Sequence, residues 1–394
     1  MKQRVIVIGH GYGIRLGVIR AVAALGCDVT VIHIGPPVKP IDCYSKYVKD
    51  VLYFNRKEGE QGLVRLLLDR CTVTGQKPVI IPTSDFSAIA IDNEEIKKHF
   101  SVPHINNTVG SSIGFWMDKS RQKELALSVG LNTARSVIAE KRGDVFFIPD
   151  GIKYPCFTKP VASIGAGKKC QGRCDTPEDL KAVLAVAERN GISQVLVEDF
   201  IDIHHEYAVL GYSNGKDVVI PGIIKFIKGS KMHKGVAMAG EVMPVTGFDE
   251  LIDKFTIFVR EMGFVGIFDI DFLECDGVFY FDEMNLRTGG SGTAIWNSGV
   301  NLPAMFVKAM CGEPTDSMER TLIRPAVFVN DKLALDDFAA GGMSLRKYRK
   351  WIGSADILFI KDENDPAPYR EFKKLERKQI YNYKRMLKRL LHND

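Results

Sequence analysis

Residues Gly266–Arg287, GIFDIDFLECDGVFYFDEMNLR, place acidic, amide and guanidinium groups on two otherwise apolar segments. Alternate residues of a strand share one face. One face of the first segment therefore carries Ile267, Asp269 and Asp271, and one face of the second carries Glu283, Asn285 and Arg287. Carboxylate and amide oxygens are hard ligands that suit Mg²⁺ or Mn²⁺, and an arginine beside them can bind phosphate. The alternative is a set of salt-bridged core carboxylates, since buried charge needs a partner.

The turn between these two segments decides whether the acids can share an ion. A two-residue Asp276-Gly277 turn in regular register would set Asp271 opposite Asp282 and leave Glu283 on the other face. A bulge at Gly277, or a three-residue loop, would bring Asp271 opposite Glu283. We predict one of these irregular connections.

Composition limits the class of protein. The 394 residues are 45% hydrophobic, enough to bury two or three domain cores, and a net charge of +5 suits small anionic substrates without arguing for nucleic acid. The eight cysteines form no CxxC pair, so we expect reduced thiols rather than zinc. The first apolar run is too short for a signal peptide, and none is long enough to span a membrane. We expect a cytoplasmic protein.

The first hundred residues alternate between strand and helix patterns. Strands are predicted at Arg4–Ile8, Asp28–Ile34 and Val79–Ile81, and helices at Ile14–Leu25 and Gly62–Cys71. This order predicts a parallel sheet with helices on both faces, which is an α/β fold.

The glycine-rich turn Gly9–Gly13 is similar to a dinucleotide fingerprint, and Gly17 would keep the following helix close to the strand. The second strand ends without an acid to hold a ribose, so a structural or anion-binding role is favoured. Arg15, with Ser84 and Asp85 after the third strand, could face a substrate carboxylate at this edge of the sheet. A solvated surface is the alternative for Arg15.

The rest of the chain mixes strands and helices. Helices are predicted at Lys119–Val129, Pro177–Asn190 and 249–262, and strands at Arg135–Ala139, Pro155–Lys159, Gln194–Phe200, Glu206–Tyr212 and Val218–Phe226. A basic amphipathic helix, Glu371–Leu391, ends the chain. Such a helix more commonly packs on the protein with a solvated basic face than contacts a membrane surface.

Two further features suggest nucleotide binding. The strand ending in Lys159 runs into Val161–Lys168, VASIGAGK, whose small residues let backbone N–H groups approach phosphates while Lys159 neutralises them. A flexible surface loop is the alternative reading of the glycines. Glu198 ends a later strand, where an acid and the backbone after it can bind an adenine edge, and Glu206 can hold a ribose.

In this order, from Asp118-Lys119 to about Met310, these motifs resemble the ATP-grasp superfamily. The resemblance implies a parallel-sheet pre-ATP-grasp domain over residues 1–110 and a two-lobed α+β ATP-grasp module. The N-lobe would cover 111–200, with a lid loop at 162–168, and the C-lobe 201–311. A C-terminal extension, 312–394, would follow.

The resemblance also implies roles for individual residues. ATP phosphates would be bound by Lys119 and Lys159 and by the lid loop with Ser163, Gly165, Gly167 and Lys168. Glu198 with the backbone of Phe200 and Ile201 would bind adenine, Glu206 the ribose, and Leu273 would pack on the base. Asp271, Glu283 and Asn285 would hold magnesium or manganese, and Arg287 with Lys159 would be catalytic. We therefore expect Lys159 and Glu283 to act on the charge of the nucleotide rather than to contribute to the packing of the fold.

Within the superfamily, the segments Gly13–Arg20 (GIRLGVIR), Cys43–Tyr47 (CYSKY) and Ile81–Asp85 (IPTSD) look like carboxylate–amine ligases of the D-aspartate-ligase type. The resemblance implies that a substrate carboxylate, on an amino acid or peptide-like molecule, attacks the γ-phosphorus of ATP. An amine then displaces phosphate from the acyl phosphate. Lys225 and Lys231 could bind the acceptor or its carboxylates.

Two alternatives remain open at this stage. One is a bicarbonate-activating carboxylase or carbamoyl-type enzyme, and the other is a nucleotide-binding protein without turnover. The partners expected in each case are small molecules, and the chain could also form a homo-oligomer.

Overall fold

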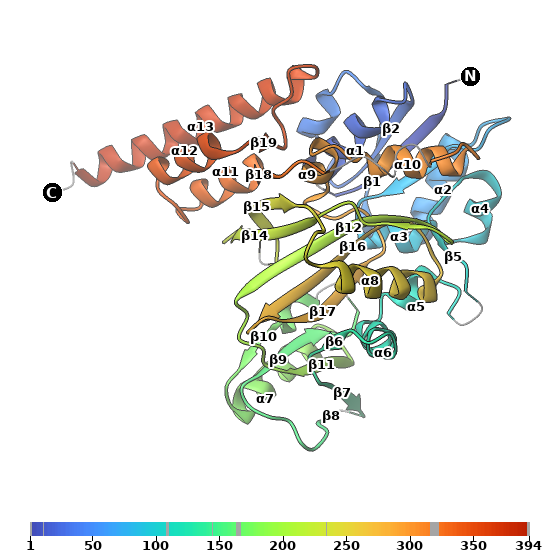
Figure 1. Cartoon of the computed structure of the whole chain (residues 1–394). Coiled ribbons are helices and arrows are strands. Elements are labelled where there is room, and N and C mark those ends of the chain that lie inside the picture. The colour runs from blue at the N-terminus through green and yellow to red at the C-terminus, as the bar shows by residue number, and fades with distance from the viewer. Residues whose placement is uncertain are drawn as a thin grey trace.

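The computed structural model describes residues 2–10, 12–107, 110–143, 145–162, 167–233, 235–315 and 323–391. These residues form three sheets, and Figure 1 shows the largest between the N-terminal domain and the smaller lobe that contains α7. The C-terminal helices lie at one end of the large sheet, beside β14 and β15. The elements are given below, sheet by sheet.

The N-terminal sheet is parallel, as predicted. Its order is β3 (Val48–Phe54), β2 (Asp28–Ile34), β1 (Arg4–Gly9) and β4 (Val79–Pro82). Its helices are α1 (Tyr12–Ala23), α2 (Gly59–Cys71), α3 (Asp85–Ile91) and α4 (Glu94–His99), with 3₁₀ turns η1 (Ile41–Tyr44) and η2 (Arg56–Glu58). Strand β3 was not predicted, because exposed Lys49 and Asp50 interrupt its apolar pattern at the edge of the sheet.

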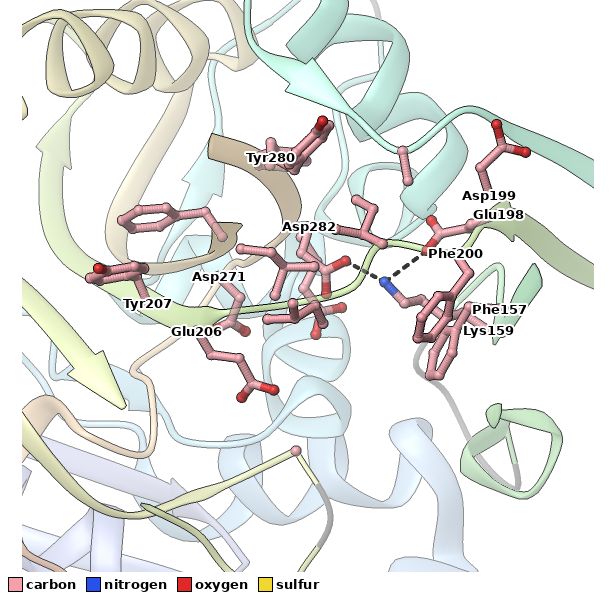
Figure 2. Close-up of a pocket in the computed structure, with 18 of the residues that line it drawn as sticks. Phe157, Lys159, Glu198, Asp199, Phe200, Glu206, Tyr207, Asp271, Tyr280 and Asp282 are labelled. Atoms are coloured by element: carbon pink, nitrogen blue, oxygen red, sulfur yellow. Dashed lines mark hydrogen bonds and ion pairs between the residues drawn. The ribbon is translucent and has the colours of Figure 1, made fainter. Parts of the chain in front are cut away.

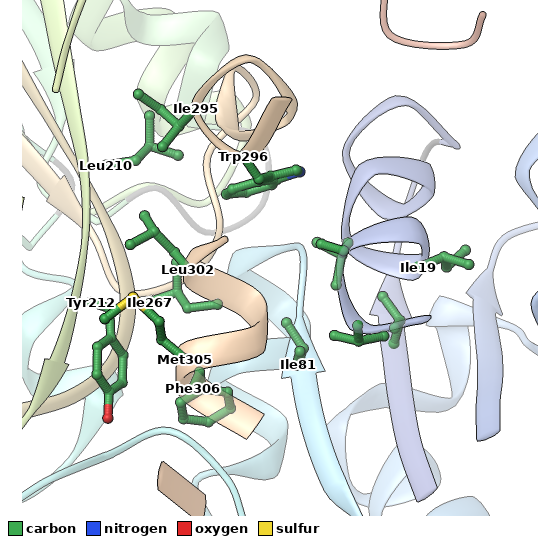
Figure 3. Packing of buried hydrophobic residues seen from close by; sticks show 14 of the residues in the cluster. Ile19, Ile81, Leu210, Tyr212, Ile267, Ile295, Trp296, Leu302, Met305 and Phe306 are labelled. Carbon is green, nitrogen blue, oxygen red and sulfur yellow. The ribbon is translucent and has the colours of Figure 1, made fainter. Parts of the chain in front are cut away.

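The N-terminal domain is joined to the large sheet by α9 (Gly292–Asn297) and α10 (Leu302–Met310). Figure 3 shows Trp296, Leu302 and Met305 of these helices between Ile19 and Ile81 of the N-terminal domain and the strands of the large sheet. The prediction that Gly17 keeps its helix close to a strand is wrong. A Cβ at Gly17 would lie 2.0 Å from Thr293 Oγ1, so this glycine lets α1 approach α9 rather than a strand.

The smaller lobe has an antiparallel sheet in the order β10 (Gly172–Cys174), β9 (Cys156–Pro160), β11 (Gln194–Asp199), β7 (Ser136–Arg142) and β8 (Val145–Phe147). Helix α7 (Pro177–Arg189) packs Leu180 and Leu184 into the core of this lobe. Thr176 caps the helix, because its side chain accepts a hydrogen bond from the Asp179 N–H. In return, the Asp179 side chain accepts one from the Thr176 N–H. A 3₁₀ turn, η3 (Gly167–Cys170), precedes β10.

The largest sheet has ten strands. Its main path is β19 (Ile357–Leu358), β18 (Ala326–Val329), β15 (Ala237–Met243), β14 (Ile223–Gly229), β12 (His205–Asn214), β16 (Phe264–Cys275), β17 (Val278–Asn285) and β6 (Asn132–Thr133), and β13 (Val218–Val219) and β5 (His104–Ile105) pair beside it. The strand predicted at Val218–Phe226 is interrupted between β13 and β14, where Pro221 cannot donate a ladder hydrogen bond. Helices α5 (Ile113–Trp116), α6 (Lys119–Ser128) and α8 (Asp249–Met262) contribute to its core.

The C-terminal segment adds β18 and β19 to this sheet and continues as α11 (Asp331–Ala339), α12 (Leu345–Ser354) and α13 (Pro366–Leu391). Helix α13 begins five residues before the predicted start at Glu371. Phe372, Leu375 and Tyr383 pack into the core that these helices share, so membrane contact through this part of the apolar face is not supported. No helix among the described residues is long and apolar enough to cross a bilayer. None of the eight cysteines, all of which lie among the described residues, forms a disulfide, so they are thiols as expected.

Candidate functional site

One cavity brings together eight of the residues that the sequence singles out. It lies between the smaller lobe and strands β12, β16 and β17, and Figure 2 shows the labelled side chains around it. The predicted site residues that line it are Lys159, Glu198, Phe200, Ile201, Glu206, Asp271, Leu273 and Glu283. They come from segments that are up to about 120 residues apart in the sequence, so the arrangement is a product of the tertiary fold.

The β16–β17 hairpin has the register needed for a shared ion. Its turn is the two-residue Asp276-Gly277, since Cys275 pairs with Val278. The ladder is regular to Phe272 opposite Phe281, then shifts so that Asp271 lies opposite Glu283. The irregularity is therefore a bulge at Asp282 and not at Gly277, which corrects the predicted position.

The bulge residue is itself part of the site. Asp282 forms an ion pair with Lys159, whose ammonium also lies 2.9 Å from Glu198 Oε2 (Figure 2). Glu198 pairs in addition with Lys123 of α6. Sequence reasoning missed both Asp282 and Lys123. A signal for Asp282 was available, because two adjacent acids on a strand can face one site only if a bulge turns one of them.

The charged groups in this network shift one another's pKa values. Burial lowers the pKa of Lys159, but Asp282 and Glu198 outweigh burial and raise it above its usual value. Burial lowers the pKa of Lys119 to about 8, although Asp282 acts in the opposite direction. Lys119 forms an ion pair with Glu283. It lies close to the proposed metal ligands, and its lowered pKa indicates a cation that an added anion would stabilise.

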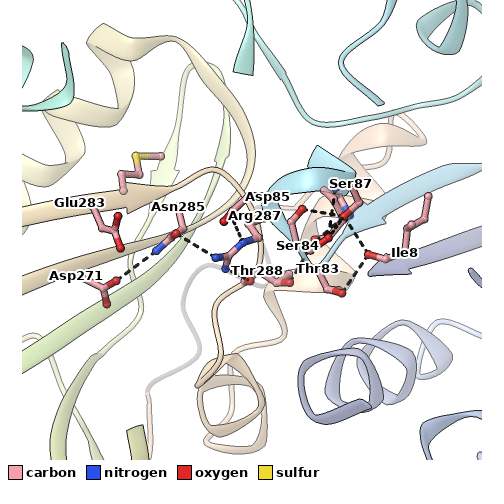
Figure 4. A network of polar contacts seen from close by, with 12 residues as sticks. Ile8, Thr83, Ser84, Asp85, Ser87, Asp271, Glu283, Asn285, Arg287 and Thr288 are labelled. Atoms are coloured by element: carbon pink, nitrogen blue, oxygen red, sulfur yellow. Dashed lines mark hydrogen bonds and ion pairs between the residues drawn. The ribbon is translucent and has the colours of Figure 1, made fainter. Parts of the chain in front are cut away.

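The residues proposed as metal ligands are also adjacent. Asn285 donates from Nδ2 to Asp271 Oδ2 at 3.3 Å, and Figure 4 shows both beside Glu283. Burial raises the pKa of Asp271, and the charges of Asp269 and Asp282 raise it further. Asp269 is 6% exposed, and its Oδ1 has no hydrogen-bond partner among the described residues. Buried and half-buried acids that repel one another are the donor set that a divalent cation satisfies, so these residues fit magnesium.

Arg287 connects this acidic cluster to the N-terminal domain. It donates from Nε to Asp85 Oδ1 at 2.6 Å and from Nη2 to Asn285 Oδ1 at 3.1 Å (Figure 4). Ser84, beside Asp85, caps α3 by accepting from the Ser87 N–H at 3.3 Å. Asp85 and Arg287 are therefore brought together across 202 residues, whereas Ser84 has a local role in the helix.

Arg15 does not have the open position that the sequence suggested. It is fully buried and donates from Nε and Nη2 to Asp42 at 2.7 and 3.0 Å, and from Nη1 to the Gly9 carbonyl at 2.7 Å. Both the substrate role and the solvated alternative are wrong. The reason is Asp42 in η1, which neutralises the guanidinium and uses its fork geometry.

The remaining predicted residues lie outside the cavity lining or outside the described residues. Lys225 lies opposite Tyr207, with Nζ 5.8 Å from its ring centroid. Lys231 is exposed, and its backbone N–H donates to Asp337 Oδ2 at 2.9 Å. Of the predicted lid loop 162–168, Ser163 and Gly165 are not among the described residues. Gly167 and Lys168 begin η3, and their side chains are not described.

This geometry agrees with the comparisons to known proteins. Residues 124–299 match the model of the ATP-grasp domain. The chain contains an ATP-grasp domain. The structure is similar to that of N5-carboxyaminoimidazole synthetase from Staphylococcus aureus in complex with ADP, with a TM-score of 0.62, 16% identity, and 84% of this chain and 83% of that chain covered. It is also similar to L-amino acid ligase from Bacillus licheniformis, with a TM-score of 0.58, 18% identity, and 83% and 79% covered.

A curated relative is the C-terminal section of the carbamoyl phosphate synthase large chain from Methanocaldococcus jannaschii. It is 23% identical over 336 residues, which cover 80% of this chain and 52% of the relative. The chain spans about half or less of the length of the first curated relatives it matches. At these identities the solved structures establish the shared fold.

Proposed function

We propose that the protein is an ATP-dependent ligase that activates a carboxylate as an acyl phosphate and transfers the acyl group to an amine, releasing ADP and phosphate. The observation that carries this proposal is a pair of contact groups on the β16–β17 hairpin: Lys159 with Asp282, and Asp271 with Asn285 and, through it, Arg287. Lys159, Asp271 and Glu283 line one cavity and offer a cation for phosphates and oxygen ligands for a divalent metal. Arg287 lies next to them in sequence and in contacts, and would serve the transferring group.

The cavity also suggests how the nucleotide would lie. Phe200 and Ile201 follow β11, where the carbonyl of the first and the N–H of the second can face an adenine edge. Glu206 on β12 would hold the ribose and Leu273 on β16 would pack on the base, and both line the cavity. Glu198 is shared between two lysines, so its main effect would be to hold Lys159 at the phosphates.

The reacting end of the site would lie at Arg287. Asp271, Glu283 and Asn285 would hold magnesium, which would neutralise phosphate charge when bound. Arg287 has the fork geometry to bind the phosphoryl group during transfer. Its ion pair with Asp85 holds the guanidinium against a carboxylate of the N-terminal domain. In this proposal that carboxylate would lie beside the reacting groups and receive the ammonium form of the amine substrate.

The substrate class is proposed from the sequence resemblance, which favours an amino acid or peptide-like carboxylate of the D-aspartate-ligase type. A second candidate is an enzyme whose carboxylate is bicarbonate. The specific observation that favours it is the match to carbamoyl phosphate synthase over 80% of the chain. Both reactions begin with phosphorylation of a carboxylate by ATP, so they require the same phosphate and metal residues.

The test is a matrix of candidate carboxylates, including bicarbonate, against candidate amines, with ADP release and product mass measured together. Hydroxylamine added with ATP and the active carboxylate should give a hydroxamate without any amine. An amide product supports the ligase, whereas turnover that requires bicarbonate supports the second candidate. Binding of MgADP without ADP formation in any arm would contradict both and leave a nucleotide-binding protein. Arg287→Ala, with binding of MgADP retained, serves as the inactive control.

A further inference from the structure

The connection between β14 and β15 is held from outside the ATP-grasp domain. Its described residues, Ser230–His233 with Gly235 and Val236, are called the β14–β15 loop below. Asp337 of helix α11 accepts the Ser230 hydroxyl at 2.7 Å and the Met232 N–H at 3.0 Å with Oδ1, and the Lys231 N–H at 2.9 Å with Oδ2. Asp337 is 1% exposed, so both of its carboxylate oxygens are used in a buried position.

Hydrogen bonds within the loop also stabilise its conformation. The His233 N–H donates to Ser230 Oγ at 3.1 Å, and the Ser230 N–H donates to the Val236 carbonyl at 2.9 Å. His233 Nε2 lies 3.5 Å from Asp336 Oδ2, which adds a second contact from α11. Three donors converging on one buried carboxylate fix the loop to α11 much more firmly than an exposed pair would.

The other side of the loop faces the site. Gly235 lines the cavity that contains Lys159 and Glu206. A Cβ added at Gly290 would lie 3.8 Å from Val236 Cγ1, so the loop also lies close to the segment that follows Arg287. The loop therefore connects α11 to the cavity at Gly235.

We propose that Asp337 is a positioning residue that fixes the β14–β15 loop against the ATP cavity, so that helix α11, outside the matched ATP-grasp domain, completes the nucleotide site. The inference rests on the proposed function only in taking the cavity to bind nucleotide. Misplacement of a positioned group by about 1 Å can lower rates by about 100-fold, so the anchor is expected to affect binding and turnover as well as stability.

The test uses the full chain, four single variants and the double variant Ser230→Ala with Asp337→Ala. Asp337→Ala removes all three bonds. Asp337→Asn keeps one oxygen as acceptor but turns an NH₂ toward the Lys231 N–H, and Ser230→Ala removes the hydroxyl that joins Asp337 to the loop. Asp365→Asn is the matched control: Asp365 is also buried and in the C-terminal segment, but it binds Arg20 and the Lys46 N–H.

Amide hydrogen exchange of residues 230–236 and the Kd for MgADP are measured for each protein, followed by kcat and KM for ATP. Asp337→Ala should speed exchange at Lys231 and Met232 and raise the Kd roughly tenfold or more. Asp337→Asn should be intermediate, and Ser230→Ala should add little to Asp337→Ala in the double variant. Asp365→Asn should lower the thermal midpoint while leaving exchange in the loop and the Kd unchanged.

The inference is overturned if Asp337→Ala behaves like the control, or if exchange in the loop rises while the Kd and KM stay at wild-type values. If Asp337→Ala does not fold, Asp337→Asn and Ser230→Ala decide the same question. A wild-type protein that binds MgADP but forms no ADP with any substrate contradicts the proposed ligase reaction alone, because exchange and the Kd still test the anchor.

Discussion

Replacing Lys159 by methionine separates its role toward the nucleotide from its role in the fold. The sequence predicts that this lysine serves only the charge of the nucleotide. The structure shows its ammonium buried between Glu198 and Asp282, with a side chain that is 9% exposed. Lys159→Met keeps most of the apolar stem but leaves Asp282 without its closest cation.

The expected loss of stability follows from these partners. Removing one member of a buried ion pair costs about 3–5 kcal/mol, because the other charge stays buried and uncompensated. Glu198 keeps Lys123, and Lys119 acts electrostatically on Asp282. We therefore expect Lys159→Met to lower the free energy of unfolding by about 3 kcal/mol, which is the lower end of this range. The double variant Lys159→Met with Asp282→Asn removes the orphaned carboxylate and should lie within about 1 kcal/mol of wild type.

Urea unfolding measures these differences, and ADP release measures the consequence for chemistry. Both variants should form no ADP, although the double variant regains stability. Exposed Lys169, in the same lobe, donates to Asn190, and Lys169→Met should change stability by less than about 0.5 kcal/mol. The reasoning is refuted if Lys159→Met loses less than about 1 kcal/mol or if the double variant is less stable than the single one.

Three other predictions can be tested in parallel. Arg287→Lys keeps the charge but cannot donate to Asp85 and Asn285 with the geometry of a guanidinium, so kcat should fall by about 10²–10³ in the ADP-release assay, and an unchanged kcat would contradict the role of the arginine. Asp271→Asn should raise the magnesium concentration needed for tight ADP binding by at least about tenfold in a calorimetric titration, and the same magnesium dependence as wild type would contradict its assignment as a ligand. Gly17→Ala should destabilise the protein by about 1–3 kcal/mol, because its Cβ would lie 2.0 Å from Thr293 Oγ1. Gly13→Ala, in the same helix with 3.7 Å to the nearest atom, should instead be neutral or stabilising by up to about 1 kcal/mol, and equal thermal midpoints for the two variants would refute the close contact.

Much of the fold could be predicted because the local periodicity of apolar residues indicates where strands and helices form. The strand and helix patterns of the first hundred residues led to the parallel sheet, and those after Lys119 led to several elements of both lobes, although β8, β10 and β15 were not predicted. The errors fall where local signals are weak or interrupted. Polar edge positions hid β3, and Pro221 split a strand that alternation alone predicts as continuous.

The candidate site, too, could be predicted only in part from the sequence. Alternation along one strand determines which side chains share its face, so Asp271, Glu283 and Asn285 could be grouped from sequence, and eight of the predicted residues line one cavity. The lid loop and the exact substrate contacts stay predictions. The two adjacent acids indicate a bulge, but its position at Asp282 was decided by the tertiary structure, and the ion pair between Arg15 and Asp42 has no signal in the residues nearby.

What the sequence by itself determined is therefore the identity of the groups and the face on which each lies, because these depend on residues within one or two turns or strand steps. The tertiary structure alone decided their partners. Arg287 meets Asp85 across 202 residues, and the β14–β15 loop meets Asp337 more than 100 residues later. Such pairs form because chain segments converge when their apolar faces are buried together, and the resulting low dielectric makes each buried charge depend on a partner that local sequence does not name.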